Sequence, residues 1–127
     1  MRCYIAGPMR SRPQFNYPAF FAAQAELERA GWQVFNPARM DIENDDGGPR
    51  LDLTFAEQKA HSGGAATSRR YAARDLKVIL WRLRAEDGDA VVMLDGWEDS
   101  TGATAERAVA KWVGLTILTL EEAIRGR

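Results

Sequence analysis

The sequence predicts an α/β fold, a doubly wound, flavodoxin-like parallel sheet flanked by helices, in a single domain over residues 1–127. Short apolar runs alternate with segments of helical periodicity, the order expected of right-handed βαβ crossovers. The run Ala90–Leu94 is apolar throughout, as in a strand buried on both faces. The length of 127 residues and the 46% apolar content suit one domain with its own core.

The N-terminal half contains two expected strands and one helix. Cys3–Ala6 is an apolar run that stops at a Gly-Pro turn, which predicts a buried strand. Tyr17–Ala30 carries apolar residues at helical spacing and is followed by Gly31, a residue typical of a helix C-terminus. Trp32–Phe35 predicts the second strand. Arg39–Gly64 is rich in Gly, Asp and Asn, and we expect a long flexible loop with one helical turn near its Phe55–Lys59 stretch.

The C-terminal half repeats the alternation. Thr67–Leu83 predicts a helix, Ala90–Leu94 the central strand, and Gly102–Val113 a second helix. Leu115–Leu118 predicts the last strand. A Thr-Leu-Glu-Glu sequence starting at Thr119 has the form of a capping box and predicts a short final helix.

Composition narrows the classes of partner. A net charge of −1 argues against a dedicated nucleic-acid-binding protein. No run approaches the roughly 20 apolar residues of a membrane span, so we expect no membrane partner and a cytoplasmic location. Cys3 is the single cysteine and is expected to be buried. No His/Cys/Asp spacing predicts a metal site, and His61 stands alone, so neither a metal nor a cofactor is expected. A local basic patch stays open, built from Arg69, Arg70, Arg74, Arg82 and Arg84.

The first candidate site is the turn after the first strand. Glycine-containing turns let backbone N–H groups approach an anion, and Arg10 can donate a charge-assisted bond to phosphate. A plain strand-ending turn with a surface arginine explains the same residues. The turn consists of Gly7, Pro8, Met9 and Arg10.

The second candidate site follows the central strand. Ser100 and Gly102 begin a helix, where free N–H groups and the helix dipole favour phosphate; ordinary N-capping by Ser100 is the structural alternative. Asp95 and Trp97 precede them. Trp97 and Trp32 can each stack on a base or pack in the core.

Two carboxylates interrupt apolar helical stripes. Glu106 lies on the face of Ala103 and Ala110, and Asp75 lies three or four residues from Tyr71 and Ile79. A carboxylate in such a stripe is costly unless it is paired or faces a cavity. The two together predict a nucleophile and a proton donor for displacement at an anomeric carbon. The alternatives are an ion pair of Glu106 with its neighbour Arg107 or with a neighbouring chain, and a cation held by both carboxylates.

Four segments together resemble the nucleoside 2-deoxyribosyltransferase-like superfamily, and especially its small phage and bacterial members. The resemblance covers nearly the whole chain outside residues 39–64. The matching segments are Tyr4–Met9, Asn16–Phe20, Gly31–Pro37 and Leu94–Glu106. Related proteins include the 2′-deoxynucleoside 5′-monophosphate N-glycosidases, in which a serine stands at the position of Pro8. Proline removes one hydroxyl and one N–H from the proposed phosphate turn.

The resemblance implies roles for these residues. Glu106 would attack C1′ of a deoxyribose, Asp75 would help to protonate the leaving base, and Tyr4 would orient Glu106. The Gly7–Arg10 turn, with Ser100 and Gly102, would hold a 5′-phosphate. The resemblance also implies a homodimer or higher homo-oligomer.

The leading hypothesis is therefore an N-glycosidase or deoxyribosyltransferase acting on a deoxynucleoside or its 5′-monophosphate. The rival is a non-catalytic protein that binds or sequesters a nucleotide derivative through the same anion sites. An oligomeric protein with a vestigial site is a third hypothesis.

Overall fold

A parallel sheet forms the centre of the computed structural model, which describes residues 1–10, 12–44 and 65–126. The sheet has four strands in the order β2-β1-β3-β4, and every pairing is parallel. The doubly wound, flavodoxin-like prediction is confirmed. Its strands are β1 (Arg2–Ala6), β2 (Gln33–Phe35), β3 (Ala90–Met93) and β4 (Thr116–Thr119).

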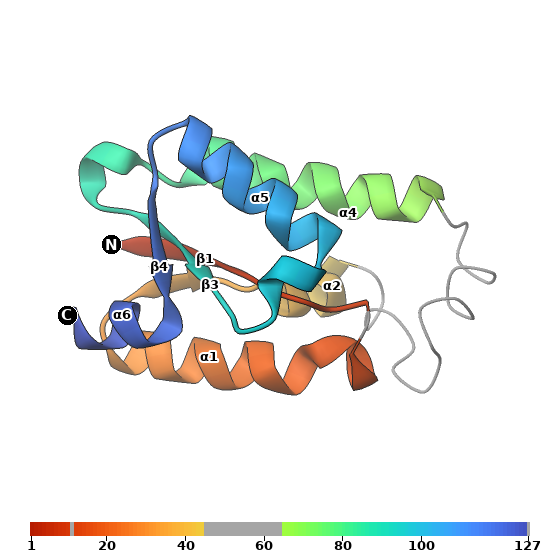
Figure 1. The fold of residues 1–127 in the computed structure, drawn as a ribbon, viewed down its shortest axis with the longest axis horizontal. Helices are drawn as coiled ribbons and strands as arrows, with labels where there is room; N and C mark the ends of the chain where they lie inside the picture. Colours follow the sequence, from red (N-terminus) through yellow and green to blue (C-terminus); the bar gives the residue numbers. More distant parts are fainter. Residues whose placement is uncertain (11, 45–64, 127) are drawn as a thin grey trace.

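Helices cover both faces of the sheet (Figure 1). One layer holds α1 (Tyr17–Arg29) and α6 (Leu120–Arg125), and the opposite layer holds α4 (Ala65–Lys77) and α5 (Thr101–Trp112). A π-helical turn, η2 (Val78–Arg82), continues α4. The shorter elements are α2 (Pro37–Asn44) and the 3-10 turns η1 (Pro13–Asn16), η3 (Ala85–Asp87) and η4 (Trp97–Asp99).

The buried strand β1 divides its side chains between two apolar layers, because successive residues of a strand point to opposite faces. Cys3 and Ile5 belong to the cluster with α1, whereas Tyr4 and Ala6 belong to the cluster with η2 and α5. All four side chains are essentially inaccessible. The tyrosine hydroxyl is thus directed beneath the helices that carry the two candidate carboxylates.

Most element boundaries fall within two residues of the sequence prediction, and the final helix begins with the predicted capping box. The loop expected from Arg39 begins later, because Pro37–Asn44 is helical. The amide of buried Asn36 starts that helix by accepting the Ala38 N–H at 2.9 Å. The rest of the expected loop, with its predicted turn at Phe55–Lys59 and with His61, lies outside the described residues.

A left-handed turn links β1 to α1. Gln14, Phe15 and Asn16 have φ values of 55°, 55° and 59°, which costs roughly 1–2 kcal/mol per residue for L-amino acids. Burial of Phe15 and a 2.8 Å bond from the Asn16 amide to the Pro8 carbonyl oppose that cost. The Gly7–Arg10 segment is therefore tied to the start of α1.

Among the residues that the structure describes, none of the helices has both the length and the apolar character needed to cross a bilayer.

Candidate functional site

A partly buried hydrogen bond joins the first strand to α5. The Tyr4 hydroxyl donates to Glu106 Oε2 at 2.6 Å. Glu106 lies in the middle of α5, on the side of the helix that buries Ala103 and Ala110. Burial, and then the charge of Asp75, raise the pKa of Glu106 to about 8, although the Tyr4 bond acts in the opposite direction.

The second carboxylate approaches the same place from α4. The Asp75 side chain is only 14% exposed. Burial raises the pKa of Asp75 to about 6, while the adjacent Arg74 guanidinium acts to lower it. Burial also raises the pKa of the Tyr4 hydroxyl, followed by the charges of Glu106 and Asp75. The hydroxyl therefore remains a proton donor between two acidic groups that influence each other electrostatically.

The place of this group in the sheet fits a ligand site. Tyr4 belongs to β1, which pairs with β2 on one side and with β3 on the other. The chain adds β2 on one side of β1 and then adds β3 and β4 on the other side. Open parallel sheets bind ligands at such a switch point, which here lies between β1 and β3. Three of the predicted site residues, Tyr4, Asp75 and Glu106, are thus brought together.

A charged network that the sequence did not predict lies beside Asp75. Arg74 Nε donates to Asp75 Oδ1 at 2.9 Å, and Arg74 Nη2 lies 2.8 Å from the same oxygen in an ion pair. The same Nη2 lies 2.7 Å from Asp41 Oδ1, and the Tyr17 hydroxyl donates to Asp41 Oδ2 at 2.7 Å. Ala38 and Asp41, three residues apart, are both buried on α2. That helical spacing was the available signal, in a segment that the sequence placed mostly in a loop.

The predicted phosphate turn has clear packing roles. A Cβ on Gly7 would lie 2.9 Å from the Leu94 Cβ, so glycine allows this close approach. Pro8 is buried and Met9 packs against the core, while Arg10 is exposed. Packing therefore explains Gly7, Pro8 and Met9, and Arg10 is the exposed charged residue of the turn.

The start of α5 combines capping with exposed backbone. The Ser100 Oγ accepts the N–H of the residue three positions on, at 3.1 Å, as predicted for an N-cap. Gly102 and Asp95 are exposed.

Arg107 lies over the Trp97 ring, 4.9 Å from its centroid. Glu106 therefore pairs with Tyr4, and the alternative of a Glu106–Arg107 ion pair is wrong.

Two further alternatives are corrected by packing. Trp32 is a core residue whose Nε1 donates to the Ala123 carbonyl at 3.1 Å, so it does not stack on a base. The predicted basic patch loses Arg74, which is buried against carboxylates. In the described part of the chain, no three His, Cys, Asp or Glu side chains gather into a group that could hold a metal ion.

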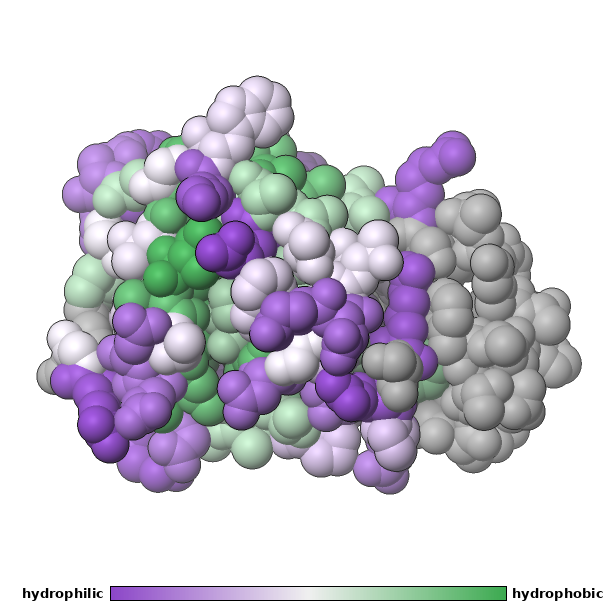
Figure 2. All heavy atoms as spheres, in the orientation of Figure 1, coloured by the Kyte–Doolittle hydropathy of each residue, from purple (hydrophilic) through white to green (hydrophobic). Residues whose placement is uncertain are grey.

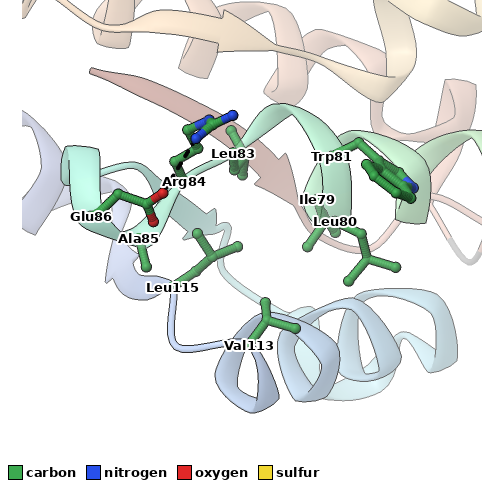
Figure 3. Close-up of a pocket in the computed structure, with 9 residues that line it drawn as sticks. All are labelled: Ile79, Leu80, Trp81, Leu83, Arg84, Ala85, Glu86, Val113 and Leu115. Carbon is green, nitrogen blue, oxygen red and sulfur yellow. Dashed lines mark hydrogen bonds and ion pairs between the residues drawn. The ribbon is translucent and has the colours of Figure 1, made fainter.

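A separate hollow, lined by both apolar and charged residues, lies where η2 meets the connection from α5 to β4 (Figure 3). Ile79, Leu80 and Val113 point into it, and the Trp81 indole lies at its rim. It contains none of the residues of the Tyr4–Glu106 site. On the face seen in Figure 2, further apolar side chains gather over β4, between α5 and α6.

Comparison with known proteins gives one family. A family model described as Domain of unknown function (DUF4406) matches residues 1–57 and 76–119. The matched stretches include Tyr4, Tyr17, Asp41 and Glu106, and the second stretch begins directly after Asp75. No curated protein and no solved structure matches the chain.

Proposed function

This chain belongs to the DUF4406 family, a domain of unknown function, and we propose that it cleaves or transfers the N-glycosidic bond of a deoxynucleoside or its 5′-monophosphate. The observation that carries the proposal is the partly buried 2.6 Å hydrogen bond between Tyr4 and Glu106, with Asp75 beside it. Two carboxyl groups close together at the strand-order reversal are the groups that displacement at an anomeric carbon requires.

The proposed reaction has two displacement steps. Glu106 attacks C1′, the C1′–N bond breaks, and its electron pair leaves with the base nitrogen, which takes a proton from Asp75. The products are a glycosyl ester on Glu106 and a free base. Water, or a nitrogen of a second base, then attacks C1′ and gives its proton to Asp75. The ester bond to Glu106 breaks, and both carboxyl groups return to their starting states.

The charges of the site favour this chemistry. The transition state carries positive charge at C1′. The network contains three acidic groups, Asp41, Asp75 and Glu106, and one guanidinium, Arg74. A buried excess of negative charge stabilises a developing cation. The Tyr4 bond fixes one oxygen of Glu106 and leaves the other for attack.

We assign the 5′-phosphate, where the substrate has one, to the start of α5 and the Gly7–Arg10 turn. Backbone N–H groups in the first turn of a helix favour anions, and Gly102 is exposed there. Arg10 supplies the nearby charge in this proposal, because Pro8 has no N–H to give.

The direct test is incubation with the four deoxynucleosides and their 5′-monophosphates, with and without a second free base, followed by chromatography of released and exchanged bases. Release or exchange supports the proposal. The rival, a binding protein, predicts that the same compounds raise the melting temperature while no base is released. If no compound is cleaved and none raises the melting temperature, both the enzyme and the binding-protein hypotheses are contradicted.

The dependence of kcat/KM on pH is expected to be bell-shaped with a maximum near pH 7. Below the Asp75 pKa of about 6 both carboxyls are protonated and no nucleophile remains. Above the Glu106 pKa of about 8 both are ionised and no donor remains. Between these values the pair holds one proton, mainly on Glu106, and the reactive form is the minor one in which Glu106 is ionised and Asp75 carries that proton. In Asp75→Asn the alkaline limb should be missing and the rate lower at every pH, because no donor proton remains to be lost. Initial rates of base release from pH 5 to 9 measure both profiles; a flat wild-type profile contradicts the assignment.

We also propose that two copies associate through the apolar surface formed by Leu80, Trp81, Trp112 and Val113. Trp81 is 76% exposed and Trp112 is 85% exposed. Buried aromatic side chains each cover about 150–250 Å², so two such indoles supply on the order of 300 Å² of the roughly 800 Å² per partner in a standard interface. Arg84 and Glu86, of opposite charge, border the hollow. A face with both charge signs suits a two-fold contact with its own copy.

Trp112→Glu is expected to convert a dimer into a monomer, because it replaces the most exposed apolar side chain of this surface with a charge. Light scattering coupled to size-exclusion chromatography gives the mass of wild type and variant. Ile42→Glu, which changes an apolar residue exposed on α2, is the matched control and should leave the dimer intact. A monomeric wild type, or a dimer that survives in Trp112→Glu and Trp81→Glu, argues against this interface.

A further inference from the structure

A second acidic residue competes with Asp75 for Arg74. Arg74 Nη2 lies 2.7 Å from Asp41 Oδ1 and 2.8 Å from Asp75 Oδ1. Asp41 comes from α2 and Asp75 from α4, so one guanidinium joins two helices. The Arg74 side chain is 20% exposed and that of Asp41 is 8% exposed. The three groups therefore interact with little screening by water.

The contact between Arg74 and Asp75 raises a difficulty for the proposed reaction. A guanidinium that donates a hydrogen bond to a carboxylate and forms an ion pair with it favours the ionised form of that carboxylate. The reaction, however, needs Asp75 to hold a proton and to deliver it to the leaving base. If Asp75 were the only partner of Arg74, its protonation would leave a buried cation without a counter-ion, which is strongly unfavourable.

We propose that Asp41 is the resident counter-ion of Arg74, and that it thereby allows Asp75 to take up and release a proton while Arg74 stays neutralised. The second half of this inference rests on the proposed function. The first half, the partition of Arg74 between two carboxylates, rests on the contacts alone. Asp41 acts through Arg74 and Asp75 and is thus a positioning residue.

Tyr17 holds Asp41 in this role. Its hydroxyl donates a hydrogen bond to Asp41 Oδ2 at 2.7 Å, while Arg74 forms an ion pair with Oδ1, so each oxygen of the carboxylate faces a partner. Burial raises the pKa of Tyr17, and the Asp41 charge adds to that shift, which keeps the hydroxyl protonated. Arg74 is further fixed by the Tyr71 ring, 5.1 Å from its guanidinium carbon. The counter-ion is therefore attached to α1 as well as to α4.

The groups that influence Asp75 come from four elements. Arg74 is its neighbour on α4, Asp41 faces it from α2, Tyr4 from β1 and Glu106 from α5. Replacing Asp41 with Asn keeps the shape of the side chain and removes one negative charge from this set. Of the two carboxylates that contact Arg74 among the described residues, Asp75 alone then remains charged beside it.

The test is a carbon-13 NMR titration of the Asp75 carboxyl in the wild-type protein and in Asp41→Asn, with Asp75→Asn used to assign the resonance. We expect the titration midpoint of Asp75 to fall by about one pH unit or more, the size of effect seen when an arginine pairs with an aspartate. Asp41→Ser is the second variant, in case Asn disturbs folding. Glu43→Gln removes a charge from the exposed side of the same helix and should leave the midpoint unchanged. An unchanged or higher midpoint in Asp41→Asn or Asp41→Ser overturns the proposal.

Activity separates the inference from the proposed function. If the wild type releases bases, Asp41→Asn should lower kcat about tenfold at pH 7 with little change in KM, because fewer molecules carry the proton on Asp75. A shifted midpoint in a protein that releases no base leaves the counter-ion standing and removes the proposed function. Base release by a wild type whose Asp75 midpoint does not respond to either Asp41 variant removes the counter-ion role and leaves the proposed function standing.

Discussion

Glu106→Gln is expected to lower base release by at least about 1,000-fold, because the amide cannot form the glycosyl ester through which the reaction is proposed to run. Gln matches Glu in size and can still accept the Tyr4 hydroxyl bond seen at 2.6 Å. The change therefore removes the nucleophile and preserves the packing on the buried side of α5. The measurement is kcat/KM for the best substrate found in the incubation screen.

Two controls make this result specific. Glu121→Gln removes a carboxylate from an exposed pair on α6 and should leave kcat/KM within about twofold of wild type. Mass spectrometry of wild type quenched during turnover should show the protein carrying one deoxyribosyl group, with its phosphate where the substrate has one. The same adduct should be missing from Glu106→Gln. Base release at the wild-type rate by that variant would exclude Glu106 as the nucleophile.

The fold was predictable because its signals are local. The apolar run at Ala90–Leu94 and the helical stripes on either side determine the alternation of strand and helix. The two carboxylates were predictable for the same reason, since a charge at an apolar helical position needs an explanation. Parallel topology then brings Asp75, Glu106 and Tyr4 to one place, although they are far apart in the chain.

The Arg74–Asp41 pairing was not predictable from the same signals. Arg74 lies in a run of arginines, and nothing local distinguishes the one that is buried from those that are exposed. Asp41 stands in a segment whose later Gly and Asp residues indicate a loop, and this composition outweighed the helical spacing of Ala38 and Asp41. The pairing depends on how α2 and α4 meet across the sheet edge, which is long-range information.

Gly7 shows a different limit of sequence reasoning, in which a clear local signal has two explanations. A glycine after a strand fits both a phosphate-binding turn and a tight packing position. The structure supplies the packing reason, the contact with Leu94. The sequence pattern alone does not distinguish a glycine required for phosphate binding from a glycine required for close packing.

The stability of the wild type is expected to fall as pH rises from about 4.5 to about 8, and Glu106→Gln should remove much of that fall. Burial raises the pKa of Glu106 from its ordinary 4.5 to about 8. In this window the folded state keeps a proton that the unfolded state has lost, so raising the pH favours unfolding. The contribution of Glu106 is complete below pH 4.5 and is lost once the pH passes about 8. Asp75, whose pKa is raised from 3.8 to about 6, adds to the fall at its acid end.

The size of the effect follows from about 1.4 kcal/mol per pKa unit. Coupling to Asp75 and partial solvation reduce the full value, so we expect Glu106→Gln to gain about 2–4 kcal/mol over wild type between pH 5 and pH 8. Urea unfolding at both pH values measures it, with Glu121→Gln as the exposed control that should follow the wild type. A variant that gains nothing between the two pH values would mean that Glu106 titrates normally in the folded protein. A variant that is inactive and yet more stable at pH 8 is the combination expected of a carboxylate that is buried for chemistry at a cost to stability.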